Sequence, residues 1–486
     1  MLFGSLEFAI FLPIVFVLYW FVTNKNLRHQ NILLLLASYF FYGWWDWRFL
    51  SLIVFSTCID YLIGIYLGID LDNRKRKFLL LSSIAMNIGF LGLFKYYNFF
   101  AESFAQAFSL FGASFEPYRL NIILPVGISF YTFQTLSYSI DVYRKKLKPT
   151  KDFITFAAFV SFFPQLVAGP IERAANLLPQ FHKPRVFSYD EASDGLKQIL
   201  WGLFKKIVIA DNCAVYANAI FDNSDNYSGS SLLIGAIFFT FQIYGDFSGY
   251  SDIAIGTAKL FRFKLMQNFA FPYFSRDFGE FWRRWHISLS TWFRDYLYIP
   301  LGGSRGSKLL SIRNVFIIFI VSGFWHGASW NFIAWGALNA AYFLPLLLLK
   351  KNRKNLNTIA ENSFFPSLKE LIGMLTTFSL TVIAWIFFRA ESLFEALNFI
   401  SNIFCKALFS FPMVEVLGQS KLQMGVVIVL IIFLIIVEWI FRKERFAFDN
   451  ISKVKPFFRW SIYLGVSILI FIFRASEKQD FIYFQF

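Results

Sequence analysis

The feature that most constrains the fold of this chain is a series of apolar runs, each long enough to cross a bilayer. The hydrocarbon core requires about 20 apolar residues per helix. Charged residues make up only 16% of the 486 residues, against about 25% in a typical soluble domain. Because lipid cannot satisfy backbone polar groups, such runs fold as helices. The sequence therefore predicts an all-α, polytopic membrane protein.

The apolar runs follow one another without a polar domain, a flexible linker or an internal repeat between them. They predict spans near 5–23, 31–47, 48–69, 78–97, 153–170, 195–220, 230–261, 311–333, 334–350, 368–389, 423–441 and 458–475. The first run lacks a basic flank and a small-residue cleavage site, so it is expected to be a retained anchor. Two further segments, 121–142 and 278–303, are interrupted by Pro, Gly or charge and are predicted to be bent or re-entrant. We expect one integral-membrane domain over residues 1–486.

Basic residues bracket the apolar runs. The net charge is +15, with clusters at 25–28, 74–77, 144–151, 350–354 and 442–455. Cytoplasmic loops of membrane proteins carry an excess of Lys and Arg, so the charge needs no nucleic acid partner to explain it. With the clusters at 25–28, 74–77, 350–354 and 442–455 inside, both chain ends are predicted to lie outside, while the middle of the chain does not determine the orientation of its spans.

A lone histidine lies in the apolar motif VSGFWHGASW at 321–330. If the span 311–333 starts inside, His326 lies about 20 Å along that helix from its last basic residue. An ionisable group at such depth is by default a functional hypothesis. The alternative is a neutral imidazole hydrogen-bonded between helices. Gly323 and Gly327 have the spacing of close helix packing, which fits both interpretations.

A second polar constellation lies upstream, in DFGEFWRRWHISLSTWFRDYLYIPLGG at 277–303. It contains His286 together with Arg283, Arg284 and Arg294. Tryptophan and arginine side chains suit a membrane interface, so one interpretation is an interfacial helix with snorkelling arginines. The other is the polar entrance of a cavity, where guanidinium groups hold the phosphates of an anionic donor.

Two acidic residues, Asp246 and Asp252, lie in the apolar run QIYGDFSGYSDIAIG at 242–256. Carboxylates inside a membrane need partners, and the cationic stretch that follows downstream is expected to supply them. A structural ion-pair role is therefore favoured over catalysis. The two histidines have no third ligand near them in sequence, and the chain lacks the common nucleotide-binding and metal-binding motifs. No metal and no permanently bound cofactor are predicted.

Three long motifs are specific enough to indicate a family. They are YGDFSGYSDIAIG at 244–256, FWRRWHISLSTWFRDYLYIPLGG at 281–303 and GFWHGASWNFIAWG at 323–336. SFFPQLVAGPIER at 161–173 and the opening MLFGSLEF also fit. With these motifs the chain resembles, essentially end to end, the membrane-bound O-acyltransferase superfamily. More closely, it resembles the alginate O-acetylation subgroup of bacterial polysaccharide O-acetyltransferases.

This resemblance implies a fold of roughly 11–12 transmembrane helices with re-entrant segments around a central tunnel, in a bacterial inner membrane. It also implies that His326 is catalytic and that His286 is a second site residue. The expected reaction moves an acetyl group from a cytosolic thioester, acetyl-CoA or another acyl donor, towards an extracytoplasmic polysaccharide. A separate SGNH-type acetyltransferase or another polymer-modification protein is the expected partner. A neutral histidine is a suitable base for such a transfer.

Aromatic residues around the site have two interpretations. Trp325 and Trp330 either line the tunnel and exclude water or serve packing alone. The tail FIYFQF, 481–486, resembles the aromatic, tyrosine-bearing ends of acyl-export systems in this superfamily. Tyr483 is therefore a candidate acyl relay, and a packing or docking role is the alternative. Other functions left open are an acyl or anion transporter, a scaffold for an outer enzyme, and transfer of a D-alanyl or long acyl group.

Overall fold

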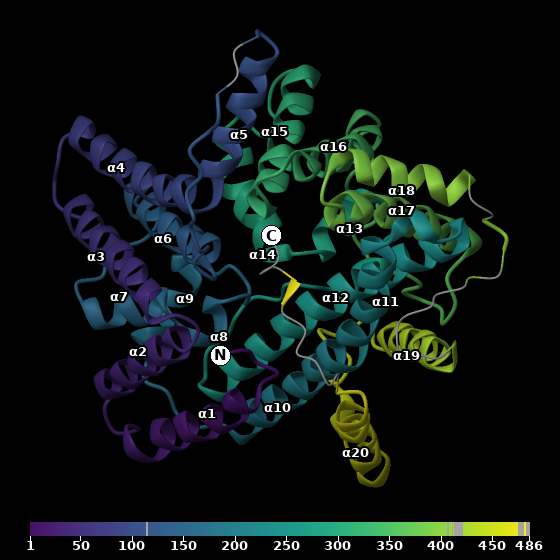
Figure 1. Cartoon of the computed structure of the whole chain (residues 1–486). Helices are drawn as coiled ribbons and strands as arrows, with labels where there is room; N and C mark the ends of the chain where they lie inside the picture. The colour runs from purple at the N-terminus through teal and green to yellow at the C-terminus, as the bar shows by residue number, and fades with distance from the viewer. Residues whose placement is uncertain (113–114, 406–407, 411, 413–420, 475–480, 483–486) are drawn as a thin grey trace. The chain divides into compact units, whose positions relative to one another are not determined.

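The computed structural model describes residues 1–112, 115–405, 408–410, 412, 421–474 and 481–482, without the side chains of residues 405 and 421. Within these ranges the chain forms helices and turns and no strand (Figure 1). Contacts divide it into two compact units, one of Met1–Gly195 with Thr257–Met266 and the other of Leu196–Gly256 with Gln267–Phe486. The prediction of an all-helical membrane protein is confirmed.

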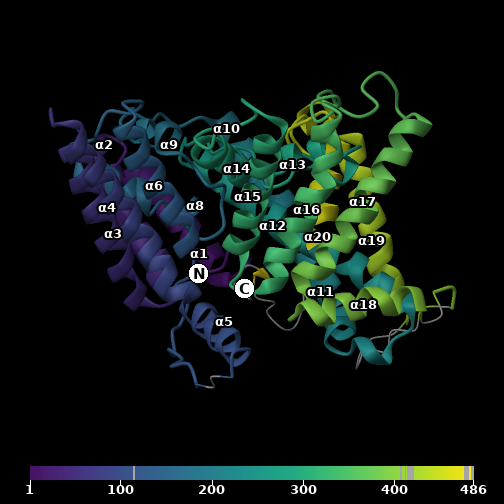
Figure 2. The ribbon, with the colours of Figure 1, turned by 90° about the horizontal axis from the view of Figure 1, so that it is seen from above.

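The first unit contains nine whole α-helices within the described residues: α1 Leu6–Val17, α2 Leu27–Gly43, α3 Leu50–Leu67, α4 Asn73–Leu91, α5 Tyr97–Ser109, α6 Ile128–Tyr143, α7 Phe153–Val160, α8 Phe163–Leu166 and α9 Ala174–Phe181. Helices α3, α4 and α6 lie side by side (Figures 1 and 2). The carboxylate of Asp60 joins them, because it accepts hydrogen bonds from Ser83 at 2.5 Å and from Asn87 and Ser139 at 2.9 Å each.

The second unit carries the candidate site. Its helices are α11 Asp211–Asp222, α13 Phe278–Arg284, α14 Ile287–Phe293, α15 Lys308–His326, α16 Trp330–Leu348, α17 Leu368–Arg389, α18 Leu393–Cys405, α19 Lys421–Ile440 and α20 Pro456–Ile472. Helices α10 Tyr189–Leu203 and α12 Gly229–Leu260 contribute residues to both units. A π-helical segment, Phe204–Ala210, joins α10 to α11, and another, Arg294–Tyr298, follows α14.

Seven helices of the described residues are long and apolar enough to cross a membrane: Trp47–Leu67, Asn73–Ser109, Gly229–Leu260, Lys308–His326, Trp330–Leu348, Leu368–Arg389 and Leu422–Ile440. Four shorter apolar helices accompany them, at Leu6–Val22, Phe153–Leu166, Leu393–Phe404 and Pro456–Ile472. Ten of the twelve spans expected from hydropathy correspond to these helices with shifted ends. The expected spans 31–47 and 195–220 match none of them, since they fall on α2 and on the stretch from α10 to α11, and Leu393–Phe404 was not expected. The clearest shift concerns the expected span 311–333, because the helix ends at His326 and the chain turns back before Trp330.

The two segments predicted to be bent differ from each other. Segment 278–303 is indeed broken, into α13, α14 and the π-helical segment that follows. Segment 121–142 instead contains one continuous helix, α6, which starts after the left-handed Gly127. The break is therefore at the Pro125–Gly127 turn rather than inside the helix.

Helices α15 and α16 form an antiparallel pair that lies side by side in both views (Figures 1 and 2). Glycines allow the close approach. A Cβ atom at Gly323 would collide with the carbonyl oxygen of Phe332, and one at Gly336 would collide with that of Phe319. The expectation of close helix packing is confirmed for Gly323, whereas Gly327 lies beyond the end of α15 and a Cβ atom there would meet the Phe332 ring. This contact fixes the end of α15, where His326 lies.

Candidate active site

His286 lies at the junction between two short helices. Helix α13 ends at Arg284, Trp285 is extended, and His286 takes a left-handed conformation with φ of 44° before α14 begins. A left-handed conformation of a residue other than glycine costs about 1–3 kcal/mol. Hydrogen bonds to Asn268 offset this strain, since the Ile287 N–H donates to its carbonyl at 2.9 Å and the Ser288 N–H to its side-chain oxygen at 3.3 Å.

The same asparagine determines the tautomer of His286. Its Oδ1 lies 3.1 Å from Nδ1 of His286 and accepts a hydrogen bond from the Ser288 hydroxyl at 2.9 Å, while its Nδ2 donates to Ser251. Because Oδ1 is an acceptor, Nδ1 of His286 carries the proton and Nε2 keeps its lone pair. This Nε2 is buried and has no hydrogen-bond partner among the described residues. The arrangement presents an acceptor nitrogen inside the protein.

Burial also determines the charge of His286. The residue is 1% exposed, and desolvation lowers its pKa from 6.5 to about 3. The imidazole is therefore neutral at physiological pH, in the form that can accept a proton. No group of three His, Cys, Asp or Glu side chains in the described ranges is placed to hold a metal ion.

The structure brings the two predicted histidines together. His326 is the last residue of α15, 4% exposed, and its ring centroid lies 6.4 Å from that of His286. Trp325 borders both rings, with its centroid 4.9 Å from His326 and 6.0 Å from His286. Trp330 is 56% exposed at the start of α16.

Other aromatic side chains, which the sequence reasoning did not single out, complete the wall around the histidines. Trp335 and Phe388 each lie 5.2 Å from the His326 ring, and Phe247 lies 4.6 Å from the His286 ring in an edge-to-face arrangement. Trp385 stacks on Trp335 at 5.9 Å. The signal for Trp335 was available, since it belongs to the motif at 323–336. Trp385 and Asn268 lie in stretches without a comparable motif.

Asp246 and Asp252 of α12 both form ion pairs, Asp246 buried and Asp252 partly buried, but the expected source of their partners is wrong. Lys206 lies 2.7 Å from Asp246, and Lys205 lies 2.7 Å from Asp252. Both lysines belong to the π-helical segment Phe204–Ala210 upstream. The wider turn of this segment lets two consecutive lysines pair with α12. The arginines downstream contact other groups.

The described end of the tail lies on α12 (Figure 1). The Ile482 N–H donates to Oδ2 of Asp246 at 2.7 Å, and the ring of Phe481 lies 4.6 Å from Tyr250 and 6.1 Å from Phe247. Phe481 and Ile482 are each 1% exposed. Tyr483 lies outside the described residues.

The three candidate arginines have different surroundings. Arg283 donates at 2.8 Å to the carbonyls of Asn352 and Asn355, and Arg284 pairs with Glu280 at 2.8 Å. Arg294 is exposed and pairs with Asp295 at 2.7 Å. Of the three, Arg294 lines a cavity.

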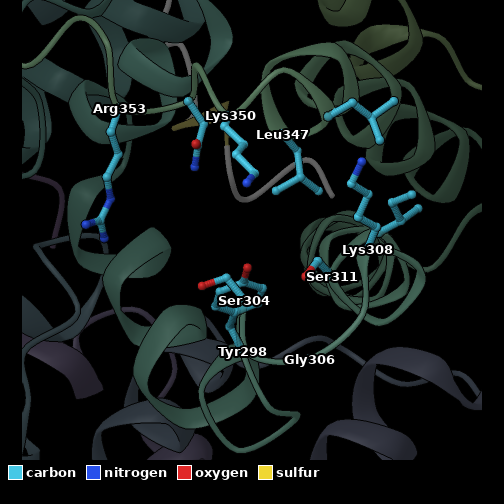
Figure 3. A pocket seen from close by; sticks show the side chains of 11 residues that line it. Tyr298, Ser304, Gly306, Lys308, Ser311, Leu347, Lys350 and Arg353 are labelled. Atoms are coloured by element: carbon cyan, nitrogen blue, oxygen red, sulfur yellow. The ribbon is translucent and has the colours of Figure 1, made fainter.

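Two cavities adjoin along α15. The larger, of about 590 Å³, is surrounded by the side chains of Lys308, Lys350 and Arg353, with Tyr298 and Ser304 opposite (Figure 3). Within the described part of the chain none of these three cations pairs with a carboxylate. The smaller, of about 200 Å³, shares Tyr298 and Asn352 with the larger and is mainly apolar. Its wall includes Leu289, Phe293, Val315, Phe319 and Ser322.

Comparison with known proteins identifies the family of this arrangement. The sequence model of the membrane-bound O-acyltransferase family matches residues 143–361. A probable alginate O-acetylase of Pseudomonas syringae pv. tomato is 42% identical over 82% of this chain and 74% of its own length. A second one, of Pseudomonas aeruginosa, is 39% identical over 88% and 79%. A peptidoglycan O-acetyltransferase of Helicobacter pylori is 36% identical over 81% and 77%.

Proposed function

The chain belongs to the membrane-bound O-acyltransferase family, and we propose that it passes an acetyl group from a cytosolic thioester across the cytoplasmic membrane for O-acetylation of a cell-surface polysaccharide. The observation that carries this proposal is the pair of buried histidines in one aromatic cluster. The named activities of the relatives support acetyl as the group and a polysaccharide as the final acceptor.

In the proposed reaction His326 is the base. Its imidazole takes the proton of an acceptor hydroxyl as the hydroxyl oxygen attacks the thioester carbonyl. A C–O bond forms, the C–S bond breaks, and the proton passes from the imidazolium to the leaving thiolate. Such general base catalysis contributes typically 10²–10⁴-fold in rate. The indoles around His326 exclude water, which would otherwise hydrolyse the thioester.

His286 has a supporting role in the same step. Its Nε2 holds a lone pair, because Asn268 fixes the proton on Nδ1. A neutral histidine with this tautomer accepts a hydrogen bond from the attacking hydroxyl or from the product thiol. The 6.4 Å between the two ring centroids leaves both nitrogens within reach of one small acyl group.

The donor side of the reaction is assigned to the two adjoining cavities. Lys308 and Lys350 meet at one end of the α15–α16 pair, which the orientation rule places inside the cell. Unpaired cations around a cavity suit the phosphates of acetyl-CoA or of another phosphopantetheine thioester. Along α15, Ser311, Val315 and Ser322 then line the way towards His326, about 22 Å from Ser311 at the rise of an α-helix. Arg294 borders the apolar part of this path.

The acceptor hydroxyl is proposed to be the phenol of Tyr483. Its neighbour Ile482 is held on α12 at Asp246, next to the Phe247 ring that contacts His286. Acetylation of the phenol yields an aryl ester that a second enzyme outside the membrane attacks, and this attack regenerates the phenol. The C-terminus is accordingly proposed to lie outside, beside an SGNH-type acetyltransferase or another polymer-modification protein.

The test is mass spectrometry of the intact protein in lipid vesicles after incubation with isotopically labelled acetyl-CoA. The expected result is one labelled acetyl group on the 481–486 peptide, absent in Tyr483→Phe and in His326→Ala. Movement of acetyl groups into vesicles without cleavage of the thioester would instead support a transporter. Labelled protein and full surface acetylation in the His326→Ala variant would refute the proposed base.

A further inference from the structure

The described end of the tail is held on α12 by a backbone hydrogen bond and by ring contacts to residues within 246–250. The polar contact is the 2.7 Å hydrogen bond from the Ile482 N–H to Oδ2 of Asp246. We propose that Asp246 is a positioning residue that sets the register of the tail against the histidine pair. This inference rests on the proposed function, because a register matters only if the residue that follows takes part in the reaction.

Asp246 is prepared for this role by its other oxygen. Lys206 lies 2.7 Å from Oδ1 of Asp246 and 2.8 Å from Asp211, and Asp246 is 2% exposed. The lysine fixes the orientation of the carboxylate, so that Oδ2 faces the tail. A hydrogen bond from a backbone N–H to a charged carboxylate is stronger than one between neutral groups.

The apolar contact adds to this anchor. The ring of Phe481 lies 4.6 Å from the Tyr250 ring and 6.1 Å from the Phe247 ring. Phe247 follows Asp246 directly, and Tyr250 lies four residues after Asp246, so the tail contacts three residues of one short stretch of α12. The ring of Phe481 and the backbone N–H of Ile482 therefore hold two consecutive tail residues on α12.

The place of the anchor links it to the chemistry. The Phe247 ring is shared between the tail and the site, since its centroid lies 6.1 Å from that of Phe481 and 4.6 Å from the His286 imidazole. A backbone N–H fixed at residue 482 determines where the chain continues, independently of which side chain residue 482 carries. Asp246 thus acts on the reaction through the tail and does not itself contact the reacting atoms.

Asp252 offers a matched control. It lies on the same helix and pairs with Lys205 at the same distance of 2.7 Å, although its side chain is 13% exposed against 3% for Asp246. Its other described partner is the side chain of Gln198 at 2.8 Å. Asp252→Asn therefore weakens a comparable ion pair without touching the tail. A second pair of variants leaves α12 unchanged: Ile482→Pro removes the backbone donor, and Ile482→Ala shortens the side chain but keeps the N–H.

The first measurement is trimming of the full-length protein in detergent by a broad-specificity carboxypeptidase, followed by intact mass. In the wild type, in Asp252→Asn and in Ile482→Ala, digestion is expected to slow at residue 482. In Asp246→Asn and Ile482→Pro, residues 482 and 481 should be removed about tenfold faster, as a loss of about 1.4 kcal/mol predicts. Equal trimming in all five proteins would overturn the anchor, whether or not Tyr483 is acetylated.

The second measurement is acetyl transfer to the tail from labelled acetyl-CoA. Asp246→Asn and Ile482→Pro should lower kcat about tenfold and leave the KM for the donor unchanged, because donor binding does not involve the tail. A released tail with undiminished transfer would instead refute the Tyr483 relay while leaving the anchor in place. Failure of the inference and failure of the proposed function thus give different results.

Discussion

The ring centroids of His286 and His326 lie 6.4 Å apart, although His326 follows His286 by 40 positions in the chain. The backbone conformations of the two residues also differ. His326 ends a 19-residue helix, while His286 lies in a left-handed junction between two helices of seven residues each. In both positions the histidine lies at a helix end and not in the middle of a regular helix. Both rings can therefore face one small volume from different directions.

The first prediction concerns this pair. His326→Ala should lower acetylation of the surface polymer about 10²–10⁴-fold, because it removes the proposed base. The measurement is acetyl ester content of the purified polymer from cells that express equal amounts of each variant. His182→Ala is a suitable control, because that histidine belongs to the other compact unit. Normal acetyl content in His326→Ala would exclude the proposed base.

The second prediction concerns Asn268. Asn268→Leu removes the acceptor that holds the proton on Nδ1 of His286, so Nε2 becomes protonated in part of the molecules. Loss of one such hydrogen bond costs about 1 kcal/mol, and we expect acetyl transfer to fall about five- to tenfold. Asn339→Leu is the control, because this buried asparagine donates its described hydrogen bond to the Trp335 carbonyl within its own helix. The measurement compares kcat for both variants in vesicles.

Much of the fold was predictable from hydropathy, because an apolar run in lipid must form its backbone hydrogen bonds internally, and a helix does this within one segment. The expected spans correspond to helices such as α12, α19 and α20. The boundary between α15 and α16 was misplaced, since hydropathy continues unbroken through 327–329, where the backbone turns. Hydropathy counts apolar side chains and does not detect a turn made by small residues in an apolar run.

The candidate site was predictable only where it lies in a motif. His286 and His326 were identified in this way, and the ionic role of Asp246 and Asp252 followed from the cost of burying a carboxylate. The ion-pair partners of the two aspartates were not predictable. Lys205 and Lys206 lie on one π-helical turn, and no sequence pattern predicts such a turn. The basic cavity was also missed, since Lys308 and Lys350 are 42 residues apart and meet only when α15 and α16 pair.

The third prediction concerns the donor cavity. Lys308→Glu and Arg353→Glu should each raise the KM for acetyl-CoA about tenfold with little change in kcat, because they repel the phosphates and leave the histidines untouched. Added salt should raise the KM of the wild type for acetyl-CoA towards that of the variants, since salt screens exposed charges. Lys351→Glu is the control, because this neighbouring lysine is not among the lining residues. An unchanged KM in both cavity variants would place the phosphates elsewhere.

The fourth prediction concerns the contact between α15 and α16. Gly323→Ala should destabilise the protein by about 1–3 kcal/mol, because the added methyl group collides with the Phe332 carbonyl and backbone must shift. Gly425→Ala in α19 is the control, since a Cβ atom there meets nothing within 4 Å. Thermal unfolding in detergent, followed by fluorescence, measures both. Equal melting temperatures would show that the helix pair has more room than its backbone distances imply.

The fifth prediction concerns acid. Folded His286 has a pKa of about 3 and the unfolded residue one near 6.5, so between these values the unfolded chain binds a proton that the folded chain does not. Stability from this residue is therefore complete above about pH 6.5 and is lost as the pH falls towards 3. At pH 5 the loss is roughly 2 kcal/mol, at about 1.4 kcal/mol for each pKa unit.

The measurement is the change in melting temperature of the detergent-solubilised protein between pH 7.5 and pH 5. His286→Asn removes the titrating ring, so this variant should melt lower than the wild type at pH 7.5 but lose less on acidification. The comparison uses the difference between the two pH values for each protein, which cancels the cost of the substitution itself. An equal acid-induced loss in both proteins would mean that His286 is accessible to protons in the folded state, and that its neutral form is not maintained by burial.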